Sequence, residues 1–150
     1  MLQFIQTNTA DCAFQLLVQA LNTELASRDG ADHPLARYNT TTGLLGVVLV
    51  YQDGQAVGCG AISTYDAKSV EIKRMYVAPS ARGKRIGERV LQELESWAKE
   101  LGYRQSLLFM GSRQPEALRL YKNNGYQSIP SYGKLKGIPE CRCFAKSLEE

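Results

Sequence analysis

Basic residues are concentrated in the stretch 73–89, and within it residues 82–87 read Arg-Gly-Lys-Arg-Ile-Gly directly before a helix-forming segment. The first N–H groups of a helix have no partner within it, and the helix dipole attracts anions to that end. A glycine-bearing turn of this kind can therefore bind phosphate groups. A solvated basic helix start or a nucleic-acid footprint would use the same residues. No aromatic-rich sheet motif or recognition-helix pattern accompanies the turn.

Other chemistries have little support in the sequence. His33 is the only histidine, so neither a histidine-based catalytic triad nor a zinc site is expected. The four cysteines show no metal or redox spacing, and we expect them to pack as free thiols, with Cys141 and Cys143 on opposite faces of a strand. No signal peptide precedes them, and the apolar run 44–51 is far shorter than the roughly 20 residues of a membrane span. These features predict a cytoplasmic protein without a metal and without a membrane partner.

The pattern of apolar residues predicts one α/β domain over residues 1–150. A length of 150 residues, 44% of them hydrophobic, suits one ordinary core, and the net charge of +3 hardly separates nucleic-acid binders from metabolic enzymes. Asp53-Gly54 is a hairpin signal, and the polar segment 27–43 is expected to form a flexible or short-helical lid. We predict strands over 2–7, 44–51, 56–65, 70–77, 106–110, 126–129 and 141–148, and helices over 11–25, 86–101 and 115–124.

The segment 71–87, taken as a whole, resembles the central motif of the GNAT family of acetyltransferases. That family has the signature Gln/Arg-x-x-Gly-x-Gly/Ala directly after a strand, and here Glu71 to Val77 would be the strand. Arg82 and Gly87 match the signature, whereas Arg85 stands where it has its first glycine. We expect that replacement to be tolerated if the local φ is negative.

The resemblance extends over roughly residues 44–148. The segment from Gln114 to Tyr121 is similar to the family helix that carries Ala-x-x-Leu-Tyr, and Gly125-Tyr126 to the Gly-Phe/Tyr that follows it. The tail looks like one bacterial branch, with Ile129, Tyr132-Gly133, Pro139 and Cys143-Phe144. Cys141 stands where this branch often has a serine, and Gln114 where many relatives have asparagine.

The resemblance implies a fold, a co-substrate and a set of binding residues. The fold would be α/β (α+β), a mixed and mostly antiparallel sheet flanked by helices and splayed between strands 70–77 and 106–110. The co-substrate would be acetyl-CoA, with no metal. The implied cofactor-binding residues are Met75, Tyr76, Val77, Arg82, Gly83, Lys84, Arg85, Ile86, Gly87, Gln114 and Tyr121. The backbone of Met75 and Val77 would bond the pantetheine arm, with the Met75 N–H near the thioester oxygen, where it stabilises developing charge.

Two catalytic residues are implied as well. Glu71 lies where several family members have a general-base glutamate. Period-2 counting places it on the same strand face as Met75, and it could act through one water. Tyr121 matches the tyrosine beside the coenzyme sulfur, and a phenol of pKa about 10 can protonate a departing thiolate whose thiol has pKa about 8.5. Alternatively, Glu71 pairs with a nearby Lys or Arg, and Tyr121 serves only helix packing. Direct attack in a ternary complex is expected, with no acyl-enzyme.

The sequence leaves the acceptor open. We expect the primary amine of a small molecule; acetylation of a protein lysine or N-terminus is the first alternative, and a coenzyme-binding module with low turnover the second. A nucleic-acid binder is a weaker reading, so no nucleic-acid partner is predicted. Residues 24–39 and 131–139 should build the acceptor pocket, where Glu24, Asp29 and Asp32 could attract a cationic acceptor. Relatives often pair, so a homodimer is a further expectation.

Overall fold

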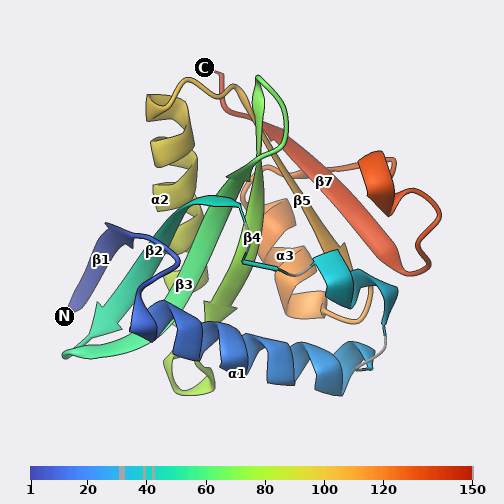
Figure 1. Cartoon of the computed structure of the whole chain (residues 1–150). Helices are drawn as coiled ribbons and strands as arrows, with labels where there is room; N and C mark the ends of the chain where they lie inside the picture. The colour runs from blue at the N-terminus through green and yellow to red at the C-terminus, as the bar shows by residue number, and fades with distance from the viewer. Residues whose placement is uncertain (31–32, 39, 42, 150) are drawn as a thin grey trace.

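The computed structural model describes residues 1–30, 33–38, 40–41 and 43–149, except for the side chain of Arg37. The predictions that concern Asp32 and Asn39 therefore lie outside the described residues. The chain forms one sheet with helices on both faces (Figure 1). The elements are β1 Leu2–Thr7, α1 Cys12–Asp29, η1 Pro34–Tyr38, β2 Leu44–Gln52, β3 Gln55–Thr64, β4 Ser69–Val77, η2 Pro79–Ala81, α2 Ile86–Glu100, β5 Gln105–Gly111, α3 Pro115–Asn123, β6 Gln127–Ile129, η3 Gly133–Leu135 and β7 Cys141–Ser147, where η marks a 3-10 helix.

The sheet has seven strands in the order β1-β2-β3-β4-β5-β7-β6. Every neighbouring pair is antiparallel except β4 and β5, which α2 connects as a crossover helix. The parallel pairing joins only Ser69–Glu71 to Gln105–Leu107. Beyond those residues β4 and β5 are not paired with each other, although each stays paired with its other neighbour. The predicted mixed, mostly antiparallel and splayed sheet is confirmed.

The two faces of the sheet carry separate apolar cores. Helix α1 packs on one face, where Phe14 is fully buried against Val47 and Cys59. Helices α2 and α3 pack on the other face, and the figure shows α1 and α2 on opposite sides of the sheet (Figure 1). The predicted apolar face of α2 comprises Ile86, Val90, Leu94, Trp97, Ala98 and Leu101. Four of these six residues are buried, as a 3.6-residue repeat requires, whereas Trp97 is half-buried and Leu101, at the C-cap, is 49% exposed.

Local sequence signals explain where several elements begin and end. Asp11 caps α1, because its side chain accepts a hydrogen bond from the Ala13 N–H at 2.9 Å. The helix continues to Asp29, past the predicted end at Leu25, so the start of the predicted lid is helical. Asp53 and Gly54 both have positive φ, 51° and 82°, which confirms the predicted hairpin turn.

The cysteine prediction needs a correction. The sulfurs of Cys141 and Cys143 lie 3.9 Å apart on one face of β7, because residues two apart in a strand point the same way. All four cysteines are free thiols, as expected. In the described part of the chain, no helix combines the length and apolarity needed to cross a membrane.

Candidate active site

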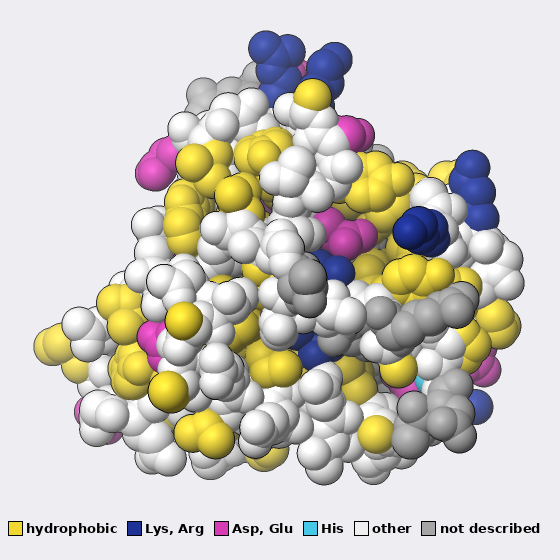
Figure 2. Space-filling view, in the orientation of Figure 1, with side chains coloured by type: hydrophobic (Ala, Val, Ile, Leu, Met, Phe, Trp, Pro, Cys, Tyr) yellow, Lys and Arg dark blue, Asp and Glu magenta, His cyan; other side chains and the backbone are white. Residues whose placement is uncertain are grey.

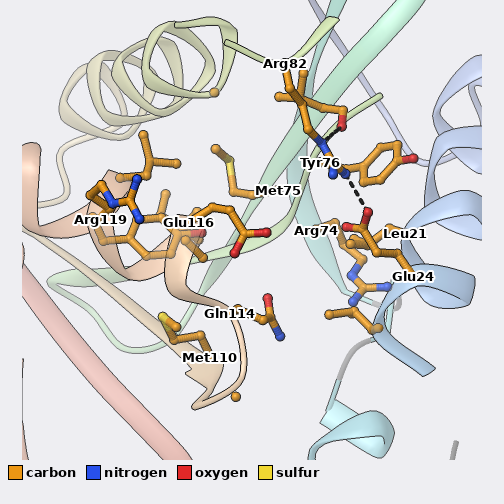
Figure 3. Close-up of a pocket in the computed structure, with 18 of the residues that line it drawn as sticks. Leu21, Glu24, Arg74, Met75, Tyr76, Arg82, Met110, Gln114, Glu116 and Arg119 are labelled. Carbon is orange, nitrogen blue, oxygen red and sulfur yellow. Dashed lines mark hydrogen bonds and ion pairs between the residues drawn. The ribbon is translucent and has the colours of Figure 1, made fainter. Parts of the chain in front are cut away.

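A cavity of about 740 Å³ opens where β4 and β5 separate. Its walls include Ile72 to Val77 of β4 and Phe109 to Gly111 of β5, which are residues beyond the paired part of the two strands. Helix α1, the turn before α2, and helix α3 close the remaining sides (Figure 3). The splay of the sheet therefore creates a site to which both strands and the helices around them contribute.

A β-bulge in β4 turns the strand at the cavity. Between Lys73 and Tyr76, β4 has two residues where β3 has one, and Arg74 takes φ +56°. Met75 consequently points toward α2, where its sulfur lies 2.6 Å from the position that a Cβ on Gly60 would occupy. Glu71, before the bulge, points to the face that carries α1. The prediction that Glu71 and Met75 share a strand face is therefore wrong, because the extra residue breaks the alternation.

The turn before α2 presents the predicted anion site to the cavity. Ile86, Gly87 and Glu88, in the first turn of the helix, line the cavity, and no side chain caps this end of α2. Their N–H groups lack partners within the helix and can therefore bind an anion. Gly83 and Arg85 also line the cavity, whereas Lys84 does not.

Arg85 adopts the left-handed conformation that the signature glycine would favour. Its φ is +60° and its ψ 24°, so the condition of a negative φ, under which the replacement was expected to be tolerated, is not met. The side chain is exposed, so the cost of the replacement is local backbone strain rather than crowding in the core.

Relief of this strain gives a testable prediction. Arg85→Gly removes about 1–2 kcal/mol of left-handed strain and adds about 0.4–1 kcal/mol of unfolded-state entropy. We expect a net gain of about 0.5–1 kcal/mol, which thermal denaturation would record as a rise of about 1–4 °C in Tm. Gly83→Ala is the matched opposite, since Gly83 has φ +83° and open space around it, and should lose stability. A loss of stability in the Arg85→Gly variant would contradict the claim that the backbone of Arg85 is strained.

Arg82 is held on the α1 side of the turn. Its Nη2 lies 2.6 Å from Glu24 Oε1, its Nε donates to the Val77 carbonyl oxygen at 2.9 Å, and its guanidinium lies 5.7 Å from the centre of the Tyr76 ring (Figure 3). The Val77 carbonyl oxygen therefore already accepts one hydrogen bond within the chain. Glu24, which was expected to attract a cationic acceptor, is occupied as well.

The C-terminal turn of α1 is tied to the start of α3 by two polar contacts. Gln114 Nε2 donates to Asp29 Oδ2 at 3.2 Å, and Arg28 forms an ion pair with Glu116. All four residues line the cavity. Gln114 is thus found in the wall as predicted, but Asp29 has a partner within the chain. The sequence did not identify Arg28 or Glu116, because no local pattern shows that these two helix ends meet.

Tyr121 reaches the cavity from α3. The side chain is 7% exposed, and its ring stands edge-on to that of Tyr126 with 5.8 Å between centres. Among the described residues its hydroxyl has no hydrogen-bond partner, and burial raises the pKa of the phenol well above its ordinary value. Tyr121 therefore presents a protonated hydroxyl donor in the wall of the cavity at neutral pH.

Glu71 lies outside the lining of the cavity. The Tyr132 hydroxyl donates to Glu71 Oε2 at 2.5 Å, and Lys73 Nζ lies 3.7 Å from Oε1. Burial first, and then the Glu71 carboxylate, raise the pKa of Tyr132. Tyr65 stands edge-on to Tyr132 at 5.0 Å. In the space-filling view, an acidic and a basic group adjoin in a recess near the centre of this side, bordered by apolar side chains (Figure 2).

The cysteines beside this cluster are poor nucleophiles. Burial, followed by the neighbouring Cys143 thiol, raises the pKa of Cys141 to about 12. Burial likewise raises the pKa of Cys59 to about 12. Since the thiolate is the reactive form, neither side chain is suited to carry an acyl group at neutral pH.

Comparison with known proteins decides the family. Residues 45–128 match the family model described as "Acetyltransferase (GNAT) domain". The chain belongs to the GNAT family of acetyltransferases. It is therefore an acetyl-CoA-dependent acyltransferase, as the sequence predicted.

Individual acyltransferases resemble the chain along most of its length. An uncharacterised N-acetyltransferase of Schizosaccharomyces pombe is 28% identical over 85% of this chain and 75% of its own. The crystal structure of a Klebsiella pneumoniae protein described as an acyl-CoA N-acyltransferase is similar at TM-score 0.85, with 28% identity over 99% of both chains. A GNAT acetyltransferase of Elizabethkingia anophelis, solved with acetyl-CoA bound, has the same fold at TM-score 0.72, with 16% identity over 97% of both chains.

Proposed function

We propose that this GNAT acetyltransferase moves the acetyl group of acetyl-CoA onto the primary amine of a small molecule, by direct attack in a ternary complex. The observation that carries the proposal is the single cavity that contains an uncapped helix N-terminus, the bulged strand β4 and the Tyr121 side chain. On this proposal, the helix N-terminus binds a phosphate group, the bulged strand faces the carbonyl oxygen, and Tyr121 faces the sulfur of one bound co-substrate.

The residues of the site fit the co-substrate. The first turn of α2 offers backbone donors to its pyrophosphate, and Arg82 and Arg85 add positive charge there. When bound, acetyl-CoA supplies an acetyl group activated as a thioester.

The side chains around the splay supply the proton transfers. The amine nitrogen bonds to the acetyl carbon, the carbon–sulfur bond breaks, and its electron pair stays on sulfur. The Met75 N–H would stabilise the charge on the oxygen, and the Tyr121 hydroxyl would donate a proton to sulfur. Glu71 would take the proton of the amine through water, because its carboxylate lies outside the cavity lining.

The wall of the cavity favours a small acceptor over a polypeptide. The Arg28–Glu116 ion pair and the Gln114–Asp29 hydrogen bond connect α1 to α3. A peptide chain that entered between these helices would have to break both contacts, whereas a small amine would not. We also propose that the enzyme works in the cytoplasm, where thiols stay reduced, in keeping with its four free cysteines.

Mass spectrometry of acetyl transfer tests the proposal. Purified protein, acetyl-CoA, a pool of small amines and a pool of peptides would be incubated and scanned for acetylated products. We expect product only among the small amines. If only peptides became acetylated, the acceptor would be a protein and not a small molecule. Coenzyme binding without any product would favour a module with low turnover.

The ion pair of Arg82 leads to a prediction for coenzyme binding. Arg82→Gln removes a cation from the phosphate site, and we expect its Kd for coenzyme A to rise about tenfold in calorimetry. Glu24→Gln is the matched control, since it removes the partner of Arg82 and leaves the cation free. That variant should bind coenzyme A at least as tightly as the wild type. Equal weakening in both variants would mean that the pair only fixes α1 to the turn.

A further inference from the structure

Arg74 is a buried cation without a carboxylate partner among the described residues. Its side chain is 5% exposed and lines the cavity. Nη1 donates to Asn22 Oδ1 at 2.5 Å, whereas Nε is buried without any hydrogen-bond partner. Glu24, drawn beside Arg74 in Figure 3, is bound to Arg82 instead.

The isolation of this charge is costly. A buried charge is normally paired with an opposite charge, and burial without a pair costs several kcal/mol. Burial accordingly lowers the pKa of Arg74 to about 10, so the group still carries its charge at neutral pH. By contrast, the neighbouring cavity arginines Arg28 and Arg82 each have a glutamate partner. Arg74 therefore offers an anion in the cavity a buried cation whose Nε has no partner within the described residues.

The phosphates of the co-substrate are poorly placed to be that anion. Three residues of strand, or about 10 Å, separate Arg74 from Val77, and η2 intervenes before the phosphate turn. The phosphate turn reaches the α1 side through Arg82, which is paired with Glu24. Its phosphate-binding N–H groups belong to α2, on the opposite face of the sheet from the α1 contact of Arg74. The anion is therefore expected from the second substrate.

We infer that Arg74, with Asn22, binds a carboxylate of the acceptor, so that the acceptor is a compact amino carboxylate such as an amino acid. The inference rests on the proposed function and names its substrate class. Arg74 directly precedes Met75, whose N–H is proposed to face the reacting carbonyl, so amine and carboxylate should be only a few bonds apart. Polyamines would place a second cation against Arg74. The carboxylates expected to attract a cation, Glu24 and Asp29, already have partners.

The inference is tested by comparing amino acids with their carboxamides and decarboxylated amines at saturating acetyl-CoA. The wild type should show a kcat/KM about 10- to 100-fold higher for the acids, the value of a charge-assisted hydrogen bond. Arg74→Met should abolish most of that preference through KM for the acceptor, with KM for acetyl-CoA unchanged. The matched control is Arg104→Met, since Arg104 lies outside the cavity lining in an exposed pair with Glu149, and it should behave as the wild type.

A binding measurement that needs no turnover separates failure of the inference from failure of the proposed function. Amino acids should raise the Tm of the wild type in complex with coenzyme A, but not that of Arg74→Met. Transfer to amines without any preference for acids, unaltered by Arg74→Met, would overturn the inference and leave the proposed function standing. A raised KM for acetyl-CoA alone would assign Arg74 to the coenzyme instead. If Arg74→Met fails to fold, Arg74→Gln tests the same outcomes.

Discussion

Tyr121→Phe is expected to lower kcat about a hundredfold or more while the Kd for coenzyme A stays within about twofold. The hydroxyl is the group proposed to protonate the departing sulfur, and the cavity wall around it is largely apolar. Phenylalanine retains the ring and its edge-on contact with Tyr126. The loss should therefore appear in turnover and not in coenzyme binding, as measured by steady-state kinetics and calorimetry.

Tyr126→Phe is the matched control for this variant. The Tyr126 hydroxyl lies 2.7 Å from Ser106 Oγ and donates to Glu95 Oε2 at 2.9 Å, so its removal should cost stability and spare kcat. Full kcat in Tyr121→Phe, with Tyr126→Phe folded, would contradict the acid role.

The pH dependence of stability supplies a second readout for Tyr121. Burial raises the pKa of its phenol, so the unfolded chain loses this proton at lower pH than the folded chain does. Stability from this group is complete below the unfolded pKa of about 10 and declines as pH rises above it. Denaturant titrations above pH 10 should therefore show a smaller decline for Tyr121→Phe than for the wild type. Identical declines in the two proteins would mean that the pKa of the Tyr121 phenol is the same in the folded and the unfolded chain.

Glu71→Gln is expected to lower kcat by about 10²-fold, because an amide cannot take a proton from the amine. The amide keeps the size of the side chain and can still accept the hydrogen bond from Tyr132. The Kd for coenzyme A should stay unchanged, so the loss should appear in turnover alone, as measured by steady-state kinetics and calorimetry.

Tyr132→Phe separates catalysis by Glu71 from its packing. That change removes the hydroxyl that donates to Glu71 but leaves the carboxylate and its contact with Lys73. We expect kcat to fall less than tenfold in this variant. If Glu71→Gln keeps the wild-type kcat, Glu71 is only a structural partner of Tyr132 and Lys73.

The sequence predicted the parts of the fold that depend on local repeats. The 3.6-residue spacing from Ile86 to Ala98 identified the buried face of α2, because each turn of a helix repeats the same environment. Asp53-Gly54 identified the hairpin, because both residues tolerate a positive φ.

Features that depend on tertiary contacts were not predicted. Period-2 counting missed the bulge at Arg74, because nothing in an arginine signals φ +56°. The burial of Arg74 follows from the packing of α1 on β4, which no local pattern reports. The left-handed Arg85 did have a signal, since the family signature has glycine at that place. Counting also put Cys141 and Cys143 on opposite faces, although residues two apart share one.

Direct transfer in the cavity is tested most directly by initial-rate kinetics in which both substrates are varied. The same test measures the intact mass of the protein after incubation with acetyl-CoA alone. Intersecting double-reciprocal lines and an unmodified protein are the predicted results, because amine and co-substrate must occupy the cavity together. Parallel lines, accompanied by a protein that gains the mass of one acetyl group, would contradict direct attack and show that the chain itself carries the acetyl group.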